Sequence, residues 1–262
     1  MGGAQRNARK RRQQQAASAG AKAVAQARGG GIDKKMVAVV VGIVLLAAAV
    51  IAGVLLTNAS KNETQGQQIA PQSGHGLAQG VVEQREGVVV VTGKPEAKTT
   101  IDLYADFLCP ACGNMQKRDS AKIEEKINAG ELKVRYHMVP MLVNASDPAG
   151  YSLDSANAAL AAADAGKFTA FHDSLFNAQP EEGKRGYDKA QLIELGKGVG
   201  ITDPNFATSV NNGVYNQQLE DEFVKTQQDP NFKGTPTVTA NGQRVEVGDP
   251  AWLDNLLATN KG

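Results

Sequence analysis

The chain has 262 residues, 42% of them hydrophobic and 21% charged, and its formal net charge is +1. It holds only two cysteines, which excludes a disulfide-rich scaffold, because such scaffolds carry four, six or eight. The near-neutral balance hides a strong charge asymmetry along the chain.

Residues 1–35 form a basic N-terminal segment rich in Gln, Ala, Gly and Arg. It carries nine Lys or Arg and one acid, Asp33, which gives it a net charge of +8. With so few apolar residues this segment cannot bury a core, and we predict a disordered tail. A basic run of this kind is usually a solvated tail, so we expect no nucleic-acid partner.

Residues 36–56 form an apolar run without any charged or polar side chain. As a helix it would be roughly 32 Å long, against about 30 Å for the hydrocarbon core of a bilayer. The run is too long for a cleavable signal, and no small-residue cleavage site follows it. We therefore predict one transmembrane helix in the lipid bilayer, in preference to a buried core helix.

The charges beside this run predict its orientation. Arg28, Lys34 and Lys35 precede it, whereas only Lys61 lies close on the other side. Positive residues favour the cytoplasmic side, so we predict a single-pass protein of the cell membrane with a cytoplasmic N-terminus and an extracytoplasmic domain. The exported part holds 19 Lys or Arg and 26 acidic residues, a net charge of −7.

The rest of the chain divides into a linker and one domain. Residues 57–80 are rich in Gln, Gly, Asn and Ser, which predicts a flexible linker. Residues 81–262 have a globular pattern and are numerous enough to fill one core. No internal repeat is present in the sequence.

The first half of this domain alternates between strand and helix patterns. Short β-branched runs predict strands at 87–92 and 99–104, and a third at 132–139. Pro110 suits the first turn of a helix, and Gly130 marks its end. Two strands joined by a helix of this length predict a parallel pair with a right-handed crossover.

The second half begins with a helical block at about 145–228. Five amphipathic or Ala-rich stretches in it are separated by Gly, Pro and Asp. A hairpin at 237–246 follows, with Asn241-Gly242 as a two-residue turn. A last helix begins at Asp249 or Pro250.

The two cysteines, Cys109 and Cys112, stand at C-x-x-C spacing where the strand pattern gives way to the helix. Such a pair can be half a metal site or inert, but zinc needs about four ligands, and the three histidines are scattered. We predict structural roles for His137 and His172. The pattern predicts a redox-active dithiol and no metal or other cofactor.

The helix start assigns different roles to the two cysteines. Disulfide exchange requires a thiolate, and unpaired N–H groups at a helix N-terminus stabilise the anion there. We predict that Cys109 is the attacking residue. Cys112 lies one turn later and is predicted to resolve the mixed disulfide.

The segment DFLCPACGNM, the helical block and the later Gly-Thr-Pro-Thr together resemble the DsbA-like branch of the thioredoxin superfamily, over residues 81–262. The resemblance implies an α/β thioredoxin-like fold with a helical insertion. It also implies an active-site motif that includes Pro110 and Ala111. Pro236 would be a cis proline beside the dithiol, and the backbone of Thr235 would bind an extended substrate segment.

Two positions of this chain depart from the family pattern, and they limit which family properties we expect of it. Strongly oxidising members have His where this chain has Ala111, so we expect a milder potential. The buried acid that often lies six residues before the first cysteine is replaced by Leu103, and Asp102 points to the opposite strand face. Asp106 matches a common family position and is a candidate proton shuttle, with helix capping as an equal alternative.

We therefore expect a membrane-anchored extracytoplasmic thiol–disulfide oxidoreductase of a bacterial envelope. Its partners would be exported proteins with cysteine pairs and, by resemblance, a membrane protein that reoxidises it. An oxidase is the preferred direction. A reductase or isomerase of the same fold is the nearest alternative, and a non-catalytic adaptor is a more distant one.

Overall fold

The computed structural model describes residues 43, 50, 64–72 and 76–259. The predicted tail at 1–35 lies outside the described residues, as does the predicted transmembrane helix at 36–56 apart from two single positions. Within the described part of the chain, no helix is both long enough and apolar enough to cross a membrane.

A six-stranded mixed sheet forms the centre of the domain, in the order β1-β2-β4-β3-β5-β6. The strands β3 and β4 are parallel and the other neighbours are antiparallel, which confirms the predicted parallel pair. The strands are β1 (Val82–Glu86), β2 (Val89–Gly93), β3 (Thr99–Ala105), β4 (Leu132–Met138), β5 (Thr237–Ala240) and β6 (Gln243–Val245).

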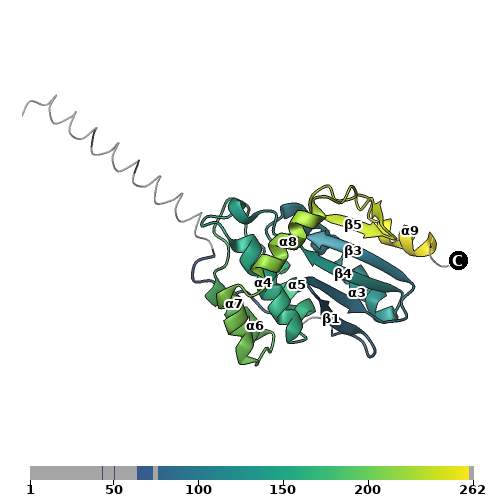
Figure 1. Ribbon diagram of the computed structural model, residues 1–262, viewed down its shortest axis with the longest axis horizontal. Helices are drawn as coiled ribbons and strands as arrows, with labels where there is room; N and C mark the ends of the chain where they lie inside the picture. Colours follow the sequence, from purple (N-terminus) through teal and green to yellow (C-terminus); the bar gives the residue numbers. More distant parts are fainter. Residues whose placement is uncertain (1–42, 44–49, 51–63, 73–75, 260–262) are drawn as a thin grey trace, which may run out of the picture. The chain divides into compact units, whose positions relative to one another are not determined.

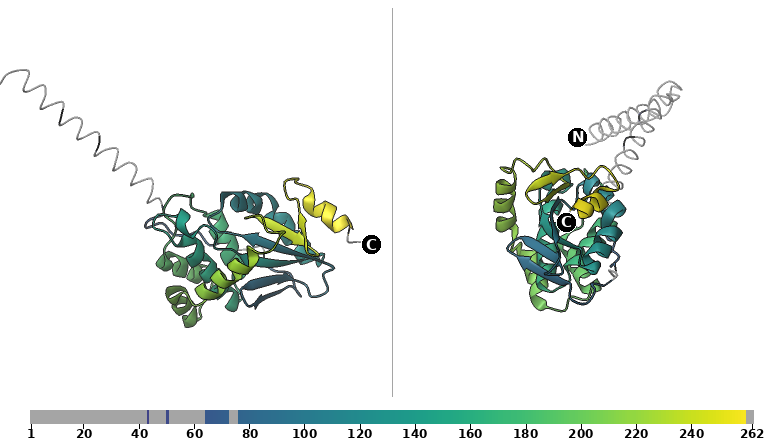
Figure 2. Two further views of the ribbon diagram at one scale, coloured as in Figure 1. Left: turned by 45° about the horizontal axis from the view of Figure 1, so that its top comes forward. Right: turned by 90° about the vertical axis from the view of Figure 1, so that its right-hand side faces the viewer.

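Helices α4 to α8 gather at one end of this sheet, whereas α9 lies towards the other end (Figures 1 and 2). The predicted helical block is therefore confirmed as a group of separate helices. The helices are α3 (Pro110–Ala129), α4 (Tyr151–Asp164), α5 (Phe168–Asn177), α6 (Lys189–Gly198), α7 (Pro204–Asn212), α8 (Asn216–Thr226) and α9 (Trp252–Thr259), with a 3₁₀ turn η1 (Val143–Ala145).

Helix α3 begins and ends where the sequence predicts. Pro110 occupies its first turn, and Gly130 ends it in the left-handed conformation with φ 78°. Ile123 and Ile127 are buried in one cluster with Trp252 of α9. Because apolar residues at this spacing share one helical face, that face packs on the sheet and sets the direction of the helix.

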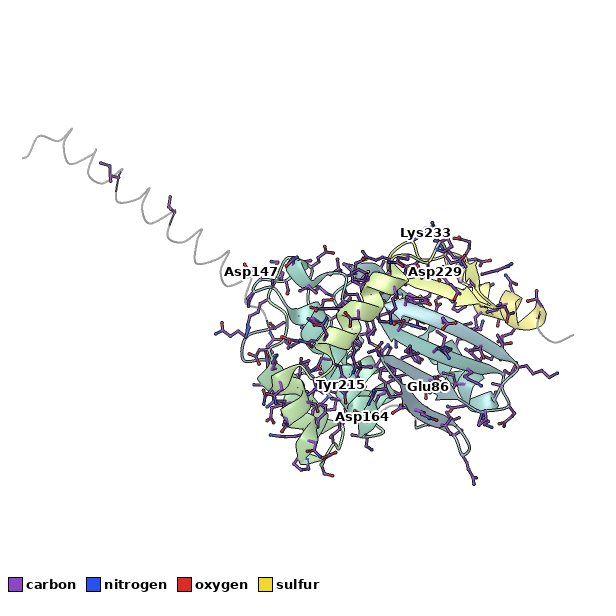
Figure 3. All side chains as sticks on the ribbon, viewed as in Figure 1. Glu86, Asp147, Asp164, Tyr215, Asp229 and Lys233 are labelled. Atoms are coloured by element: carbon purple, nitrogen blue, oxygen red, sulfur yellow. The ribbon has the colours of Figure 1, made fainter. Side chains whose placement is uncertain are left out.

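Strand β1 was not predicted, because its sequence has one valine, Val82, followed by four polar residues, and so lacks the apolar alternation of a half-buried strand. Arg85 of this strand donates a hydrogen bond to Asp164 of α4, and its guanidinium lies 4.7 Å from the centre of the Tyr215 ring. The Tyr215 hydroxyl also donates to Asp164, and Figure 3 shows these two side chains. These contacts tie the edge of the sheet to the helical block.

Residues 64–72 form a strap that packs against the domain. Ile69 is buried in the main core cluster, with 3% of its surface exposed. The Thr64 hydroxyl donates to the carbonyl of Gly186 at 2.9 Å, and Gln191 donates to the carbonyls of Thr64 and Gln67 at 2.6 and 2.7 Å. The prediction of a flexible linker over 57–80 is therefore wrong for the strap, because one buried isoleucine and a set of amide contacts dock it.

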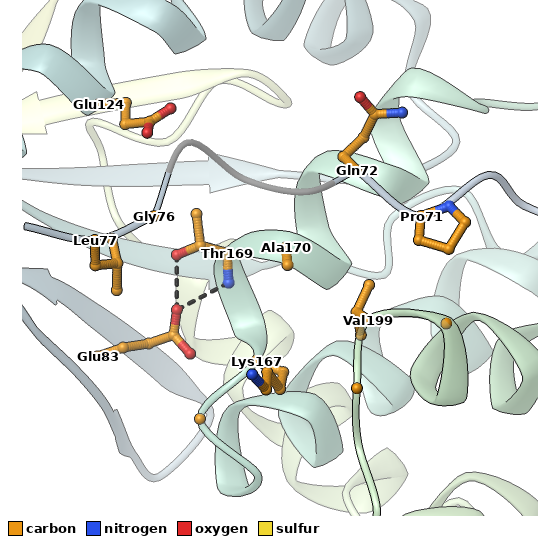
Figure 4. Close-up of a pocket in the computed structure, with 13 residues that line it drawn as sticks. Pro71, Gln72, Gly76, Leu77, Glu83, Glu124, Lys167, Thr169, Ala170 and Val199 are labelled. Atoms are coloured by element: carbon orange, nitrogen blue, oxygen red, sulfur yellow. Dashed lines mark hydrogen bonds between the residues drawn. The ribbon is translucent and has the colours of Figure 1, made fainter.

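A cavity of about 600 Å³ lies beside the strap, between Pro71 and the helices α5 and α6 (Figure 4). Glu83 on its wall accepts hydrogen bonds from the backbone N–H groups of Phe168 and Thr169 and from the Thr169 hydroxyl. This carboxylate therefore caps the start of α5. Neither cysteine lines the cavity.

Candidate active site

The dithiol lies at the junction of β3 and α3. Cys109 is the N-cap residue of α3, and the exposed Pro110 follows it in the first helical turn. The Cys109 thiol donates a hydrogen bond to the carbonyl of Thr235 at 3.3 Å. The Thr235–Pro236 bond is cis, as the resemblance implies. The fold thus brings together two segments that are 126 residues apart.

The environment of Cys109 favours its thiolate. Its pKa is lowered to about 6, chiefly because the Cys112 thiol donates a hydrogen bond to it. Burial opposes this shift, and the Thr235 side chain and the N–H groups of Cys112 and Ala111 support it. The hydroxyl of Thr235 is buried and, in the described part of the chain, has no partner besides the two cysteines. The N–H groups at the start of α3 therefore help to lower the pKa of Cys109, but Cys112 lowers it most.

Cys112 has the opposite behaviour. Its hydrogen bond to Cys109 raises its pKa strongly, and burial and the negative charge of Cys109 add to the shift. Only 3% of its surface is exposed, compared with 6% for Cys109. One cysteine is thus ready to react at neutral pH, whereas the other must lose a proton first.

Gln179, in the loop after α5, holds the backbone of the active-site segment. Its Nε2 donates to the carbonyls of Phe107 and Cys109 at 3.0 and 2.9 Å. Its Oε1 lies 2.0 Å from the place where a Cβ would stand on Gly113, so glycine leaves room for this amide. Sequence reasoning missed Gln179, because nothing in the local pattern connects a loop of the helical block to the dithiol.

Asp106 lies at the end of β3 with its carboxylate engaged by three donors. These are the N–H groups of Leu108 and Leu142 at 2.8 and 2.9 Å and the Ser152 hydroxyl at 2.5 Å. Burial raises the pKa of Asp106. The carboxylate therefore joins the loop after β3 to the loop after β4 and to α4, and none of these donors is a backbone N–H of α3. Its role as a proton shuttle stays a prediction.

Neighbouring residues of β3 point to different faces of the sheet, as predicted. Leu103 is buried in the core. Asp102 accepts hydrogen bonds from His137 at 2.8 Å and from Arg135 at 3.0 Å, and these partners hold its pKa below the usual value although burial alone would raise it. No group of three potential metal-ligating side chains occurs in the described ranges.

The family model described as thioredoxin matches residues 85–258. The chain belongs to the thioredoxin family. The reduced disulfide oxidoreductase DsbG from Mycobacterium tuberculosis is 29% identical to it with a TM-score of 0.58, covering 70% of this chain and 88% of that one. Oxidised DsbA from M. tuberculosis has the same identity and TM-score and covers 70% and 93%.

Two other relatives add less. The thiol–disulfide oxidoreductase MdbA from Corynebacterium matruchotii, 23% identical with a TM-score of 0.60, covers 76% of this chain and 99% of that one, and shows the fold alone. The serine/threonine-protein kinase PknE of M. tuberculosis is 28% identical over 177 residues, 64% of this chain. The chain spans 31% of that relative's length.

The site and these relatives together identify the chemistry. The protein is a thiol–disulfide oxidoreductase with a thioredoxin-like α/β fold that resembles DsbA. It contains the C-P-A-C segment at the start of α3.

Proposed function

We propose that this oxidoreductase is an oxidase that gives the disulfide between Cys109 and Cys112 to exported proteins. The observation that carries the proposal is the pKa of Cys109, lowered to about 6. A stabilised thiolate stabilises the reduced form of the enzyme, so its disulfide is passed on more readily.

The exchange has two steps. A client thiolate attacks Sγ of Cys109, the bond to Cys112 breaks, and the client is held as a mixed disulfide. A second client thiolate then attacks the client sulfur, and Cys109 leaves as a thiolate. The backbone of Thr235 would pair with an extended client segment, which permits many different sequences.

The proposed oxidase is anchored by residues 36–56, with its dithiol outside the cytoplasm of a bacterial cell. The uncharged run and the positive charges before it support this arrangement. A membrane protein would reoxidise the dithiol. A membrane-impermeant maleimide applied to intact, reduced cells should label Cys109 at neutral pH, and failure to label it there while it is labelled in lysed cells would contradict the placement.

The same dithiol could work in reverse as a reductase or isomerase. Ala111 favours this alternative, because strongly oxidising relatives have histidine there. Equilibrating the purified protein with glutathione redox buffers separates the two directions. The oxidase should have a redox potential well above that of thioredoxin, which is around −270 mV. A potential at the thioredoxin value would overturn the oxidase proposal.

A further inference from the structure

A small cavity under the active site joins Cys112 to a histidine of the helical block. Cys112 and His172 both line it, together with Gln116 of α3 and the cis residue Pro236. Its volume is about 10 Å³, close to what one water molecule needs. Cys112 and His172 therefore border the same small cavity.

His172 lies on α5 with 4% of its surface exposed. Its Nδ1 is 2.9 Å from Oδ1 of Asp173, and the same oxygen accepts a hydrogen bond from Gln116 at 2.8 Å. Nε2 is the ring nitrogen that this contact with Asp173 does not occupy. The carboxylate thus fixes one nitrogen and leaves the other able to exchange a proton.

Aromatic rings enclose this histidine. Their centroids lie 4.9–5.6 Å from that of His172, and they belong to Phe107, Tyr136, Phe168 and Phe176. Such a cage keeps bulk water away from the imidazole, which is 4% exposed. Leu103 stands where relatives often hold a buried acid, and it lines the same cavity. The cavity has no carboxylate in its wall.

We propose that His172 is the proton partner of Cys112, taking its proton when the thiol attacks and returning it when the thiolate leaves. The inference rests on the dithiol chemistry of the enzyme and holds for either direction of exchange.

The proposed step balances in both directions. When a mixed disulfide at Cys109 is resolved, the proton of Cys112 passes to Nε2 of His172, directly or through one water. Sγ of Cys112 then bonds to Sγ of Cys109, and the partner leaves as a thiolate. When a client thiolate attacks the enzyme disulfide, Cys112 leaves as a thiolate and receives the proton from the imidazolium.

The charged groups near this site are acidic. Asp173 touches His172 on the same helix, and it acts on the neighbouring Tyr136 together with Glu83 of β1 and Glu124 of α3. The pKa of Cys112 is strongly raised, first by its hydrogen bond to Cys109 and then by burial. Burial remains when Cys109 is held in a mixed disulfide, so the attacking thiol still needs a base.

The test follows the two cysteines separately in one reaction. The reduced protein is mixed with an aromatic disulfide that releases a coloured thiolate, and release is followed by stopped flow. The first phase reports attack by Cys109 and the second reports resolution by Cys112. His172→Phe, which suits the aromatic cage, should slow the second phase about a hundredfold, a typical contribution of general base catalysis, and leave the first phase unchanged.

The pH profile and two further variants complete the test. In the unaltered protein the second phase should rise through the titration of an imidazole and then level, whereas in His172→Phe it should rise steadily with pH. His172→Gln, which keeps a polar side chain without a base, should behave in the same way, and it replaces His172→Phe if that variant does not fold. His137→Gln, on the opposite face of the sheet, should leave both phases unchanged.

Folded His172 variants with an unaltered second phase, or a slowing shared by both phases, would overturn the proposal. Neither result bears on the oxidase proposal, which depends on the separate glutathione equilibrium.

Discussion

The two cysteines of the active site have different surroundings: we call those of Cys109 the rim and those of Cys112 the floor. At the rim, the Cys112 thiol, the Thr235 side chain and the first N–H groups of α3 lower the pKa of Cys109, and the Cys112 thiol contributes most. At the floor, Cys112 shares a small cavity with side chains of α3, α5 and β3, and its hydrogen bond to Cys109 and its burial raise its pKa. Two chemically identical thiols three residues apart therefore do different work.

The largest effect should come from exchanging one sulfur for oxygen. Cys109→Ser should abolish disulfide exchange, because the reactive thiolate is gone. Cys112→Ser should instead accumulate clients as mixed disulfides at Cys109, visible as bands that disappear with reductant on gels. An unaltered cellular function in Cys109→Ser would favour the non-catalytic adaptor.

The rim thiolate should also make the stability of the reduced protein depend on pH. The pKa of Cys109 falls from 9.0 to about 6 on folding, so folding is favoured increasingly as pH rises between these values. The stabilisation is complete above the unfolded pKa and is lost as pH falls through about 6. Urea unfolding across this range measures it, with the oxidised protein and Cys109→Ala as controls that should lack the slope.

Substitution of Gln179, whose amide holds the backbone of the active-site segment, should have a smaller effect. Gln179→Leu leaves two carbonyls without this donor and should lower the free energy of unfolding by about 1–3 kcal/mol. Gln217→Leu, at an exposed position, is the matched control and should change it little.

A double-mutant cycle sharpens this prediction. Gly113→Ala should displace the Gln179 amide and cost a similar amount, but it should add little in a Gln179→Ala background, because the displaced group is then absent. Strictly additive losses would mean that the alanine strains the helix and leaves the amide in place.

The smallest effect is expected at the hydroxyl of Thr235. Thr235→Val keeps the side-chain shape and removes a group that lowers the pKa of Cys109. The pKa, followed by the ultraviolet absorbance of the thiolate, should rise only modestly because Cys112 remains the main cause of the shift. A rise as large as that in Cys112→Ser would reverse this ranking.

The surroundings of Cys109 can be predicted from the sequence better than those of Cys112. Local patterns predict β3, α3 and β4, because β-branched runs, Pro110 and Gly130 determine strand and helix boundaries through neighbouring residues. The position of Cys109 follows directly from these boundaries. The cis state of Pro236 came from the family resemblance, and the sequence pattern alone does not distinguish the isomers.

The remaining features depend on tertiary contacts. Gln179 and His172 reach the dithiol from the helical block, so their spacing along the chain contains no sign of it. Strand β1 has one apolar residue in five and forms by pairing at the edge of the sheet. The strap was missed for the same reason, since Ile69 is a single apolar residue in a polar segment.

If residues 36–56 anchor the protein as proposed, the docked strap would limit how far its domain can move from the membrane. With the proposed anchor ending at Leu56, only eight peptide units separate it from Thr64, and these extend at most roughly 29 Å. The catalytic domain would then stay close to the lipid surface and would not reach clients farther from the membrane.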